Sequence, residues 1–269
     1  MEITKSVKEL CDRSVGDVVA EDFRLAKVFK EYGIDFCCGG ETSVKDACEA
    51  KGIACDDIFQ ALANAADAPE EKKADHLDVR SWEPDFLASY IVNIHHRYVR
   101  DASPIIRELT KTVARVHGAT HPETVRISEL TDELTRELAQ HMADEEQKFF
   151  PYVASLCAAS RKGENVVNSA DKPVEALEHE HDRAGGLIKE IRALSRDFDM
   201  SHSPCSTSRI AYYELEKFET DLHRHVHLEN NILFPAVACI EQSLAGAATS
   251  ESATSSRTKR IQLRTVLPE

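Results

Sequence analysis

The sequence predicts an all-α protein, in which an antiparallel four-helix bundle follows a small helical domain that carries a Cys-Cys pair. Beyond about residue 81, long segments place apolar side chains three or four residues apart, as amphipathic helices do. Two of these segments contain one motif, with His141 and Glu145 in the first copy and His225 and Glu229 in the second. Phe-Pro and Val-Ala follow at the same spacing in both copies. A duplicated helical hairpin therefore builds the bundle.

The composition restricts the partners and the location of the protein. A chain of 269 residues with 42% hydrophobic residues can bury a sizeable core. The net charge of -14 disfavours nucleic acid and anionic membrane surfaces as partners. No apolar run reaches the length of a membrane span, and the polar N-terminus does not resemble a secretory signal. We therefore expect a cytoplasmic protein that binds neither nucleic acid nor a membrane, with most of its cysteines reduced.

Residues 1–65 are predicted to form the small helical module. A turn over residues 34–40 carries Cys37 and Cys38, followed by two glycines that leave the backbone free to expose the sulfur atoms. Because adjacent cysteines close only a strained ring, a permanent disulfide between them is disfavoured. The pair could exchange thiols, contact a metal or take part in iron transfer, or it could pack as two small buried side chains. The residues alone leave these alternatives open.

The remaining chain divides by composition. Residues 66–80 are charged and contain a proline, which is typical of a linker. We assign residues 81–242 to the four-helix bundle and residues 243–269, which are rich in Ala, Ser and Thr, to a disordered tail. The four bundle helices are expected over about residues 81–116, 120–156, 173–195 and 207–239.

A second repeat relates the first and third bundle helices, which share a His-x-Arg pattern that begins at His95 and at His181. The offset from His95 to His181 is 86 residues, and that from His141 to His225 is 84 residues. At ~1.5 Å of rise per residue, the histidines of each antiparallel pair lie at the same depth within one helical turn. In a helix, residues i and i+4 share a face, so each Glu joins its His. The predicted ligands are His95, His141, Glu145, His181, His225 and Glu229.

Other histidines compete for these positions. His179, His223 and His227 each lie two residues from a chosen ligand, roughly 200° around the helix, so we expect them to be surface residues that face away. His96 is adjacent to His95, and only the repeat register and the level along the bundle favour His95.

Four imidazoles and two carboxylates favour iron over zinc. A structural zinc ion needs four ligands and gains nothing from two additional carboxylates. Two iron ions bridged by both carboxylates would take two imidazoles each and leave room for an oxo bridge and an exogenous ligand. The predicted cofactor is therefore an oxo- and carboxylate-bridged pair of iron ions.

Four motifs carry a resemblance to a known family: Tyr32-Gly-Ile-Asp-Phe-Cys-Cys-Gly-Gly40, Glu180-His-Asp182, His141-Met-Ala-Asp-Glu-Glu146 and Leu228-Glu-Asn-Asn-Ile-Leu-Phe-Pro235. Over about residues 10–240 the chain resembles the repair-of-iron-centres (RIC) proteins, which join a short Cys-Cys module to a haemerythrin-like bundle. The resemblance implies a haemerythrin-like fold, di-iron ligands on the six residues named above, and the family's cysteine pair on Cys37 and Cys38. Oxygen-carrying haemerythrins add a His-x-x-x-His motif, and no His lies four residues from His181, so dioxygen carriage is disfavoured.

The resemblance implies that the protein repairs iron-sulfur clusters damaged by nitric oxide or oxidants, with iron-sulfur proteins as its clients. The iron pair would supply iron or redox equivalents. An alternative function is the binding or reduction of nitric oxide, since nitric oxide and dioxygen are ligands of ferrous iron. A third interpretation, a metal that only stabilises an interaction protein, is the least favoured. The Cys-Cys module could dock on its own bundle or on a second subunit of a homodimer.

Overall fold

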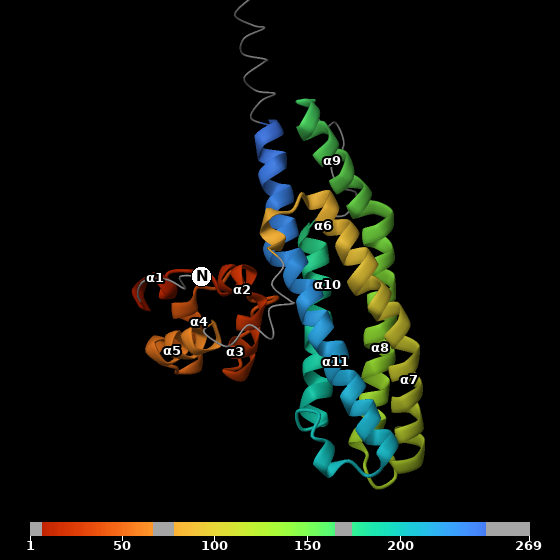
Figure 1. Ribbon diagram of the computed structural model, residues 1–269. Helices are drawn as coiled ribbons and strands as arrows, with labels where there is room; N and C mark the ends of the chain where they lie inside the picture. Colours follow the sequence, from red (N-terminus) through yellow and green to blue (C-terminus); the bar gives the residue numbers. More distant parts are fainter. Residues whose placement is uncertain (1–6, 67–77, 165–173, 246–269) are drawn as a thin grey trace, which may run out of the picture.

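The computed structural model describes residues 7–66, 78–164 and 174–245. Over these ranges the chain is helical, and the only β-type pairing is an isolated bridge between Ser14 and Ser43. A compact group of short helices lies beside one long bundle (Figure 1). The predicted fold, an all-α bundle preceded by a small helical domain, is confirmed.

Within residues 7–66, the small domain contains five short helices with clear local end signals. Ser14 and Ser43 cap α2 and α4, since each hydroxyl accepts a hydrogen bond from a backbone N–H three residues later. Gly33, with φ of 67°, lies just after α3 in the left-handed conformation that ends helices. The bounds are α1 Val7–Cys11, α2 Val15–Glu21, α3 Ala26–Glu31, α4 Val44–Lys51 and α5 Cys55–Ala66, with a 3-10 turn at Phe23–Leu25.

The bundle consists of four long helical rods, three of which are interrupted by one π-helical turn. The first rod is α6 (Pro84–Ile91), a π turn (Val92–His96) and α7 (Arg97–His117). The second is α8 (Glu123–Asp144), a π turn (Glu145–Phe149) and α9 (Phe150–Lys162). The third is α10 (Val174–Leu194). The fourth is α11 (Ser206–Leu228), a π turn (Glu229–Leu233) and a final helix over 234–245. Short 3-10 turns occupy Val79–Ser81 and Met200–His202.

Antiparallel helices pack side by side (Figure 1): α7 with α8 and α8 with α10, whose rods follow one another in the chain, and α11 with α7, which brings the last rod against the first. Their apolar side chains form two separate clusters. One includes Ile91, Phe149 and Phe234 near the α6 and α9 end of the bundle. The other includes Val99 and Leu222 and continues into the small domain. The two clusters leave a layer between them in which polar side chains are buried.

The small domain docks on its own bundle, along α11 and the start of the last π turn. Lys30 Nζ forms an ion pair with Glu219 Oε2 at 2.7 Å. The ring of Phe36 lies 6.0 Å from that of His227. The amide of Asn231 fills the space beside Gly40, where an added Cβ would lie 2.1 Å from Asn231 Oδ1. Close packing at this seam therefore requires glycine.

Two predicted segments fall largely outside the described residues. Most of the predicted linker, residues 67–77, and most of the predicted tail, residues 246–269, are not described. In the ranges that the structure covers, every helix is too short or too polar to cross a lipid bilayer.

Candidate metal centre

A layer of six polar side chains separates the two apolar clusters of the bundle. Each of the four rods contributes one histidine, and two of the rods also contribute a glutamate. All six are at most 4% exposed, and both glutamates are fully buried. Buried carboxylates are stable only when they are paired or bind a cation. The members of this cluster are His96, His141, Glu145, His181, His225 and Glu229.

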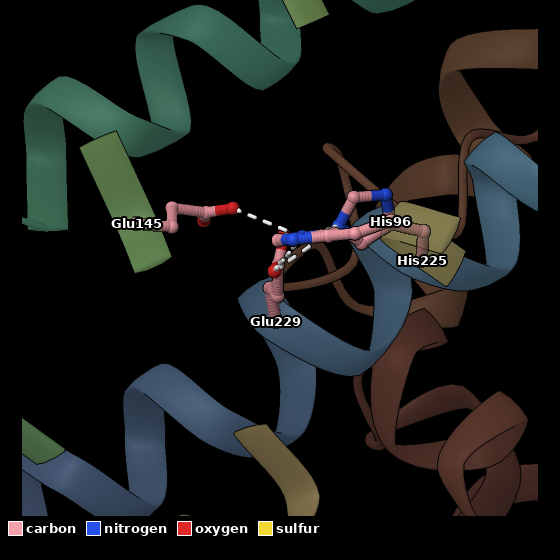
Figure 2. A group of neighbouring side chains, drawn as sticks. All are labelled: His96, Glu145, His225 and Glu229. Atoms are coloured by element: carbon pink, nitrogen blue, oxygen red, sulfur yellow. Dashed lines mark hydrogen bonds and ion pairs between the residues drawn. The ribbon is translucent and has the colours of Figure 1, made fainter. Parts of the chain in front are cut away.

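The first half of the cluster is formed by His96 and His225 with one oxygen atom from each glutamate. The Nε2 atoms of the two imidazoles are 3.2 Å apart. Glu145 Oε2 lies 3.3 Å from His96 Nε2, and Glu229 Oε1 lies 3.1 Å from His225 Nε2. Figure 2 shows the Glu145 carboxylate pointing from the opposite rod towards the two imidazoles. Four potential ligand atoms therefore converge on one point.

The second half repeats this arrangement with His141 and His181. Their Nε2 atoms are 3.0 Å apart. Glu145 Oε1 lies 3.3 Å from His141 Nε2, and Glu229 Oε2 lies 3.1 Å from His181 Nε2. Each carboxylate thus directs one oxygen atom to each half. Two carboxylates that each face two pairs of imidazoles are suited to bridge two metal ions.

The structure corrects the expectation that His95 joins this cluster, because His96 lies in it instead. In a regular α-helix, Ile91, His95 and Val99 would share the inward face. The π turn at Val92–His96 inserts one residue, so that the side chain five residues after Ile91, that of His96, takes the inward position. The helix propensities of the residues do not reveal a π turn. The one available signal was the offset from His96 to His181, which is 85 residues and closer to the 84 of the other repeat.

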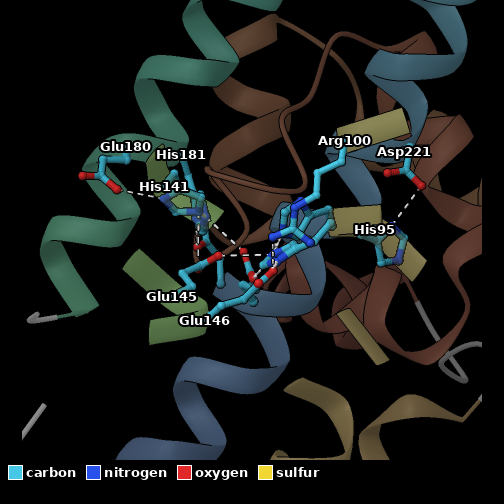
Figure 3. A network of polar contacts seen from close by, with 12 residues as sticks. His95, Arg100, His141, Glu145, Glu146, Glu180, His181 and Asp221 are labelled. Carbon is cyan, nitrogen blue, oxygen red and sulfur yellow. Dashed lines mark hydrogen bonds and ion pairs between the residues drawn. The ribbon is translucent and has the colours of Figure 1, made fainter. Parts of the chain in front are cut away.

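His95 is buried beside the cluster and outside it. Its Nδ1 atom lies 2.9 Å from Asp221 Oδ1, and its ring stacks on that of His225 at 5.8 Å. Figure 3 shows this pair apart from the remaining network. Burial lowers the pKa of His95, although Asp221 opposes the shift. His95 therefore packs against a cluster residue and leaves the metal positions to others.

The expectation for the other histidines is partly corrected. His227 does lie outside the cluster, but it is only 1% exposed, because the small domain covers it. Its ring packs against those of Phe23 and Phe36, with centroid distances of 5.8 Å and 6.0 Å. His223 is half-buried against the same domain, whereas His179 is exposed as expected. A docked domain hides a helix face that sequence periodicity assigns to solvent.

Carboxylate and amide groups orient three of the four imidazoles from behind. His96 Nδ1 lies 2.7 Å from Glu146 Oε1, and Arg100 binds the same oxygen atom (Figure 3). His141 Nδ1 lies 2.8 Å from Glu180 Oε2. These contacts fix the proton on Nδ1 and leave Nε2 free to face the centre of the cluster.

The third imidazole, that of His181, is oriented by an amide: its Nδ1 atom lies 2.7 Å from Asn230 Oδ1. The sequence motifs included Glu146, Glu180 and Asn230, but their role in orienting the imidazoles became evident only from the structure.

Without a metal, the close contacts in the cluster raise the pKa of an imidazole and lower the pKa of a carboxyl group. Burial alone would lower the pKa of His141, but Glu145 and Glu180 outweigh it and raise the pKa to about 10. Burial alone would raise the pKa of Glu229, but His225 and His181 outweigh it and hold the pKa well below the usual value. Both oxygen atoms of Glu145 lack a hydrogen bond among the described residues. Buried, ionised and incompletely paired carboxylates beside four imidazoles fit cations.

Comparison with known protein families identifies both parts of the chain. The model described as the hemerythrin HHE cation binding domain matches residues 87–237. The model described as a domain of unknown function (DUF542) matches residues 11–66. The first match covers more than half of the chain. This chain belongs to the hemerythrin family.

Curated relatives extend the similarity to the whole two-domain arrangement. An iron-sulfur cluster repair protein YtfE of Pectobacterium atrosepticum is 32% identical over 231 residues, which cover 83% of this chain and 96% of that protein. An iron-sulfur cluster repair protein ScdA of Staphylococcus haemolyticus is 29% identical over 82% of this chain and 95% of its own length. The resemblance predicted from the motifs is thereby confirmed. This member of the hemerythrin family has a cation-binding domain, and the buried cluster is the candidate for its metal site.

The Cys-Cys pair of this hemerythrin-family chain lies in the small domain, at the corner between α3 and α4. Cys37 is buried and Cys38 is half-buried, and both are free thiols, with their sulfur atoms 4.0 Å apart. Asp35 Oδ1 accepts hydrogen bonds from both backbone N–H groups at 3.0 Å. The pair therefore lies outside the six-residue cluster. The carbonyl group of Cys37 nevertheless contacts the π turn of the fourth rod, which also carries Glu229 of the cluster.

Proposed function

We propose that the six-residue cluster binds two iron ions and that the protein repairs damaged iron-sulfur clusters. The observation that carries the first part is that each buried carboxylate approaches an imidazole in both halves of the cluster, at 3.1 to 3.3 Å. Each half offers two nitrogen and two oxygen atoms, a mixed ligand set that suits iron. The matching family model is described as a cation binding domain, which supports a cation site in the bundle.

The charges support two divalent ions at this position. Four neutral imidazoles and two carboxylates leave two such ions with excess positive charge. Carboxylates behind the imidazoles, at Glu146 and Glu180, balance part of that charge at hydrogen-bond distance. A single zinc ion would leave at least two buried ligands unused.

The repair function is supported by the curated relatives, whose names describe iron-sulfur cluster repair. Bound iron would supply transferable iron and one-electron chemistry. The residues of this chain bind the ions, hold Nδ1 protonated on the imidazoles that carboxylates orient, and exclude water through the apolar clusters on both sides. The proposed clients are iron-sulfur proteins damaged by nitric oxide or oxidants, and Cys37 and Cys38 take part by thiol chemistry or iron transfer.

The test uses the full chain loaded anaerobically with ferrous iron and a dehydratase whose [4Fe-4S] cluster has been damaged by nitric oxide. We expect the loaded protein to restore dehydratase activity faster than an equal amount of free iron. Glu229→Ala should remove both the bound iron and the repair. A protein that consumes nitric oxide yet restores no activity would contradict the repair function and favour the alternative.

A second variant separates the cysteine pair from the iron site. Cys37→Ala combined with Cys38→Ala should keep the iron and the helical content, because neither residue lies in the cluster. If the pair takes part in repair, the rate per bound iron pair falls. An unchanged rate per iron pair would remove the cysteines from the reaction and leave the bundle as the sole active part.

A further inference from the structure

The corner between α3 and α4 brings three potential metal ligands together. Cys37 Sγ lies 4.0 Å from Cys38 Sγ and 3.3 Å from Asp35 Oδ1. Each residue offers a ligand atom within 4.8 Å of the other two. A tetrahedral ion with bonds of ~2.3 Å to sulfur and ~2.0 Å to oxygen has edges of about 3.8 Å between sulfur atoms and about 3.5 Å between sulfur and oxygen. The two separations from Cys37 Sγ lie within about 0.2 Å of these edges.

The backbone of this corner is held in place from both sides. Asp35 accepts the backbone N–H groups of Cys37 and Cys38. The carbonyl group of Cys37 accepts hydrogen bonds from the side-chain amides of Asn230 at 3.4 Å and Asn231 at 3.1 Å. A site whose backbone is fixed before binding loses little conformational entropy when an ion arrives.

The corner also has space for an ion and a further ligand. It borders a cavity of about 370 Å³ between the small domain and the bundle, lined by Cys37, Cys38, Gly185 and His223 among others. Gly185 of α10 faces the sulfur atom of Cys38, and an added Cβ there would lie 3.7 Å from it. A larger side chain at Gly185 would fill the space in front of the sulfur atom.

Metal binding at the pair requires both sulfur atoms as thiolates. A divalent cation would supply the positive charge that stabilises the two thiolates, and the thiol protons would pass to water.

We propose that Asp35, Cys37 and Cys38 form a second metal site, separate from the bundle cluster, for one thiophilic divalent ion such as Fe²⁺ or Zn²⁺. Two thiolates and one carboxylate bind the ion, two protons leave, and the fourth position opens to the cavity. No electron transfer is involved. Asn230 hydrogen-bonds both the Cys37 carbonyl and His181 of the bundle cluster, so one side chain lies between the two sites. A role in passing iron to or from the bundle rests on the proposed function, whereas the binding itself does not.

The test is a titration of the metal-free full chain with Co²⁺ under anaerobic, reducing conditions. Thiolate bound to cobalt absorbs in the near ultraviolet by charge transfer, and the bundle cluster contains no sulfur ligand. We expect this band in the unchanged protein, with one more bound equivalent than in Cys37→Ser or Cys38→Ser, both of which lose the band. Asp35→Asn should weaken the affinity about 10-fold or more.

Two controls decide the assignment. Cys55→Ser, at a half-buried cysteine elsewhere in the small domain, should keep the band. Glu229→Ala should keep the band while it loses cobalt from the bundle, so a failed repair function would leave this result intact. Cobalt uptake by the bundle and an unchanged circular dichroism spectrum verify that the Cys37 and Cys38 variants fold. A band that survives Cys37→Ser, or that disappears with Cys55→Ser, would overturn the proposal.

Discussion

Asn230 Oδ1 lies 2.7 Å from His181 Nδ1, so a single amide orients one imidazole of the buried cluster. The same amide donates from Nδ2 to the carbonyl of Cys37 in the small domain. The neighbouring residue Asn231 also donates to that carbonyl, but its other contacts include the carbonyl of Phe36, the ring of His227 and Gly40, none of which belongs to the cluster. The two adjacent asparagines therefore have separable roles.

We predict that Asn230→Ala lowers the metal affinity of the bundle by about 10- to 100-fold, because His181 loses the group that fixes its orientation. Asn231→Ala is the matched control, and it should keep the affinity while it loosens the small domain. Metal competition with a chelator measures the first effect, and hydrogen exchange of α2 and α3 measures the second. Equal metal affinity in the two variants would contradict the role of Asn230.

The position of His96, rather than His95, in the cluster can be tested directly by mutation. His96→Ala should strongly deplete the metal, because it removes a nitrogen atom of one half of the cluster. His95→Ala should retain the metal and cost about 1–3 kcal/mol of stability, since its partner Asp221 loses a largely buried hydrogen bond. Elemental analysis after iron loading and thermal unfolding measure the two effects. If His95→Ala lost the metal while His96→Ala retained it, His95 would be the ligand, as the sequence suggested.

The seam between the two domains should weaken in acid. Burial alone would raise the pKa of Glu219, but Arg192 and Lys30 outweigh it and hold the pKa below 4.5. Because the folded pKa lies below the unfolded one, this contribution to stability is present above about pH 4.5 and is lost as the pH falls through the folded pKa. Glu219→Gln should cost about 1–3 kcal/mol at pH 7.

Chemical denaturation of both proteins at pH 7 and near pH 3 provides the check. The difference between the unchanged protein and Glu219→Gln should shrink in acid, because the carboxyl group of the unchanged protein then becomes neutral. A difference that stays constant across this range would show that Glu219 does not change its protonation state between pH 7 and pH 3.

Metal uptake by the bundle should release protons. In the metal-free protein the pKa of His141 is raised to about 10, so its imidazole is protonated at pH 7. Binding through Nε2 requires the neutral imidazole, and the affinity for metal should therefore fall as the pH is lowered. A pH indicator in weakly buffered solution measures the release during titration with Zn²⁺ or Fe²⁺. Uptake without a change in pH would mean that the imidazoles of the cluster carry no additional protons before binding.

Local patterns in the sequence determined the bundle and most of the cluster. His141 and Glu145, like His225 and Glu229, lie one α-helical turn apart, and their spacing survives because the π turns begin at the glutamates. His181 followed from the repeat. These are relations within one helix or between copies of one motif, and the periodicity of an amphipathic helix is sufficient to reveal them.

Only the tertiary structure decided which of two adjacent histidines enters the cluster and which face of α11 meets solvent. The π turn at Val92–His96 replaces α-helical hydrogen bonds, and side-chain propensity does not specify such a turn. The burial of His227 depends on contacts with Phe23 and Phe36, residues about two hundred positions earlier in the chain. The apolar periodicity of a sequence describes each helix by itself. The choice of His96 and the burial of His227 depend instead on how the helices pack against the rest of the molecule.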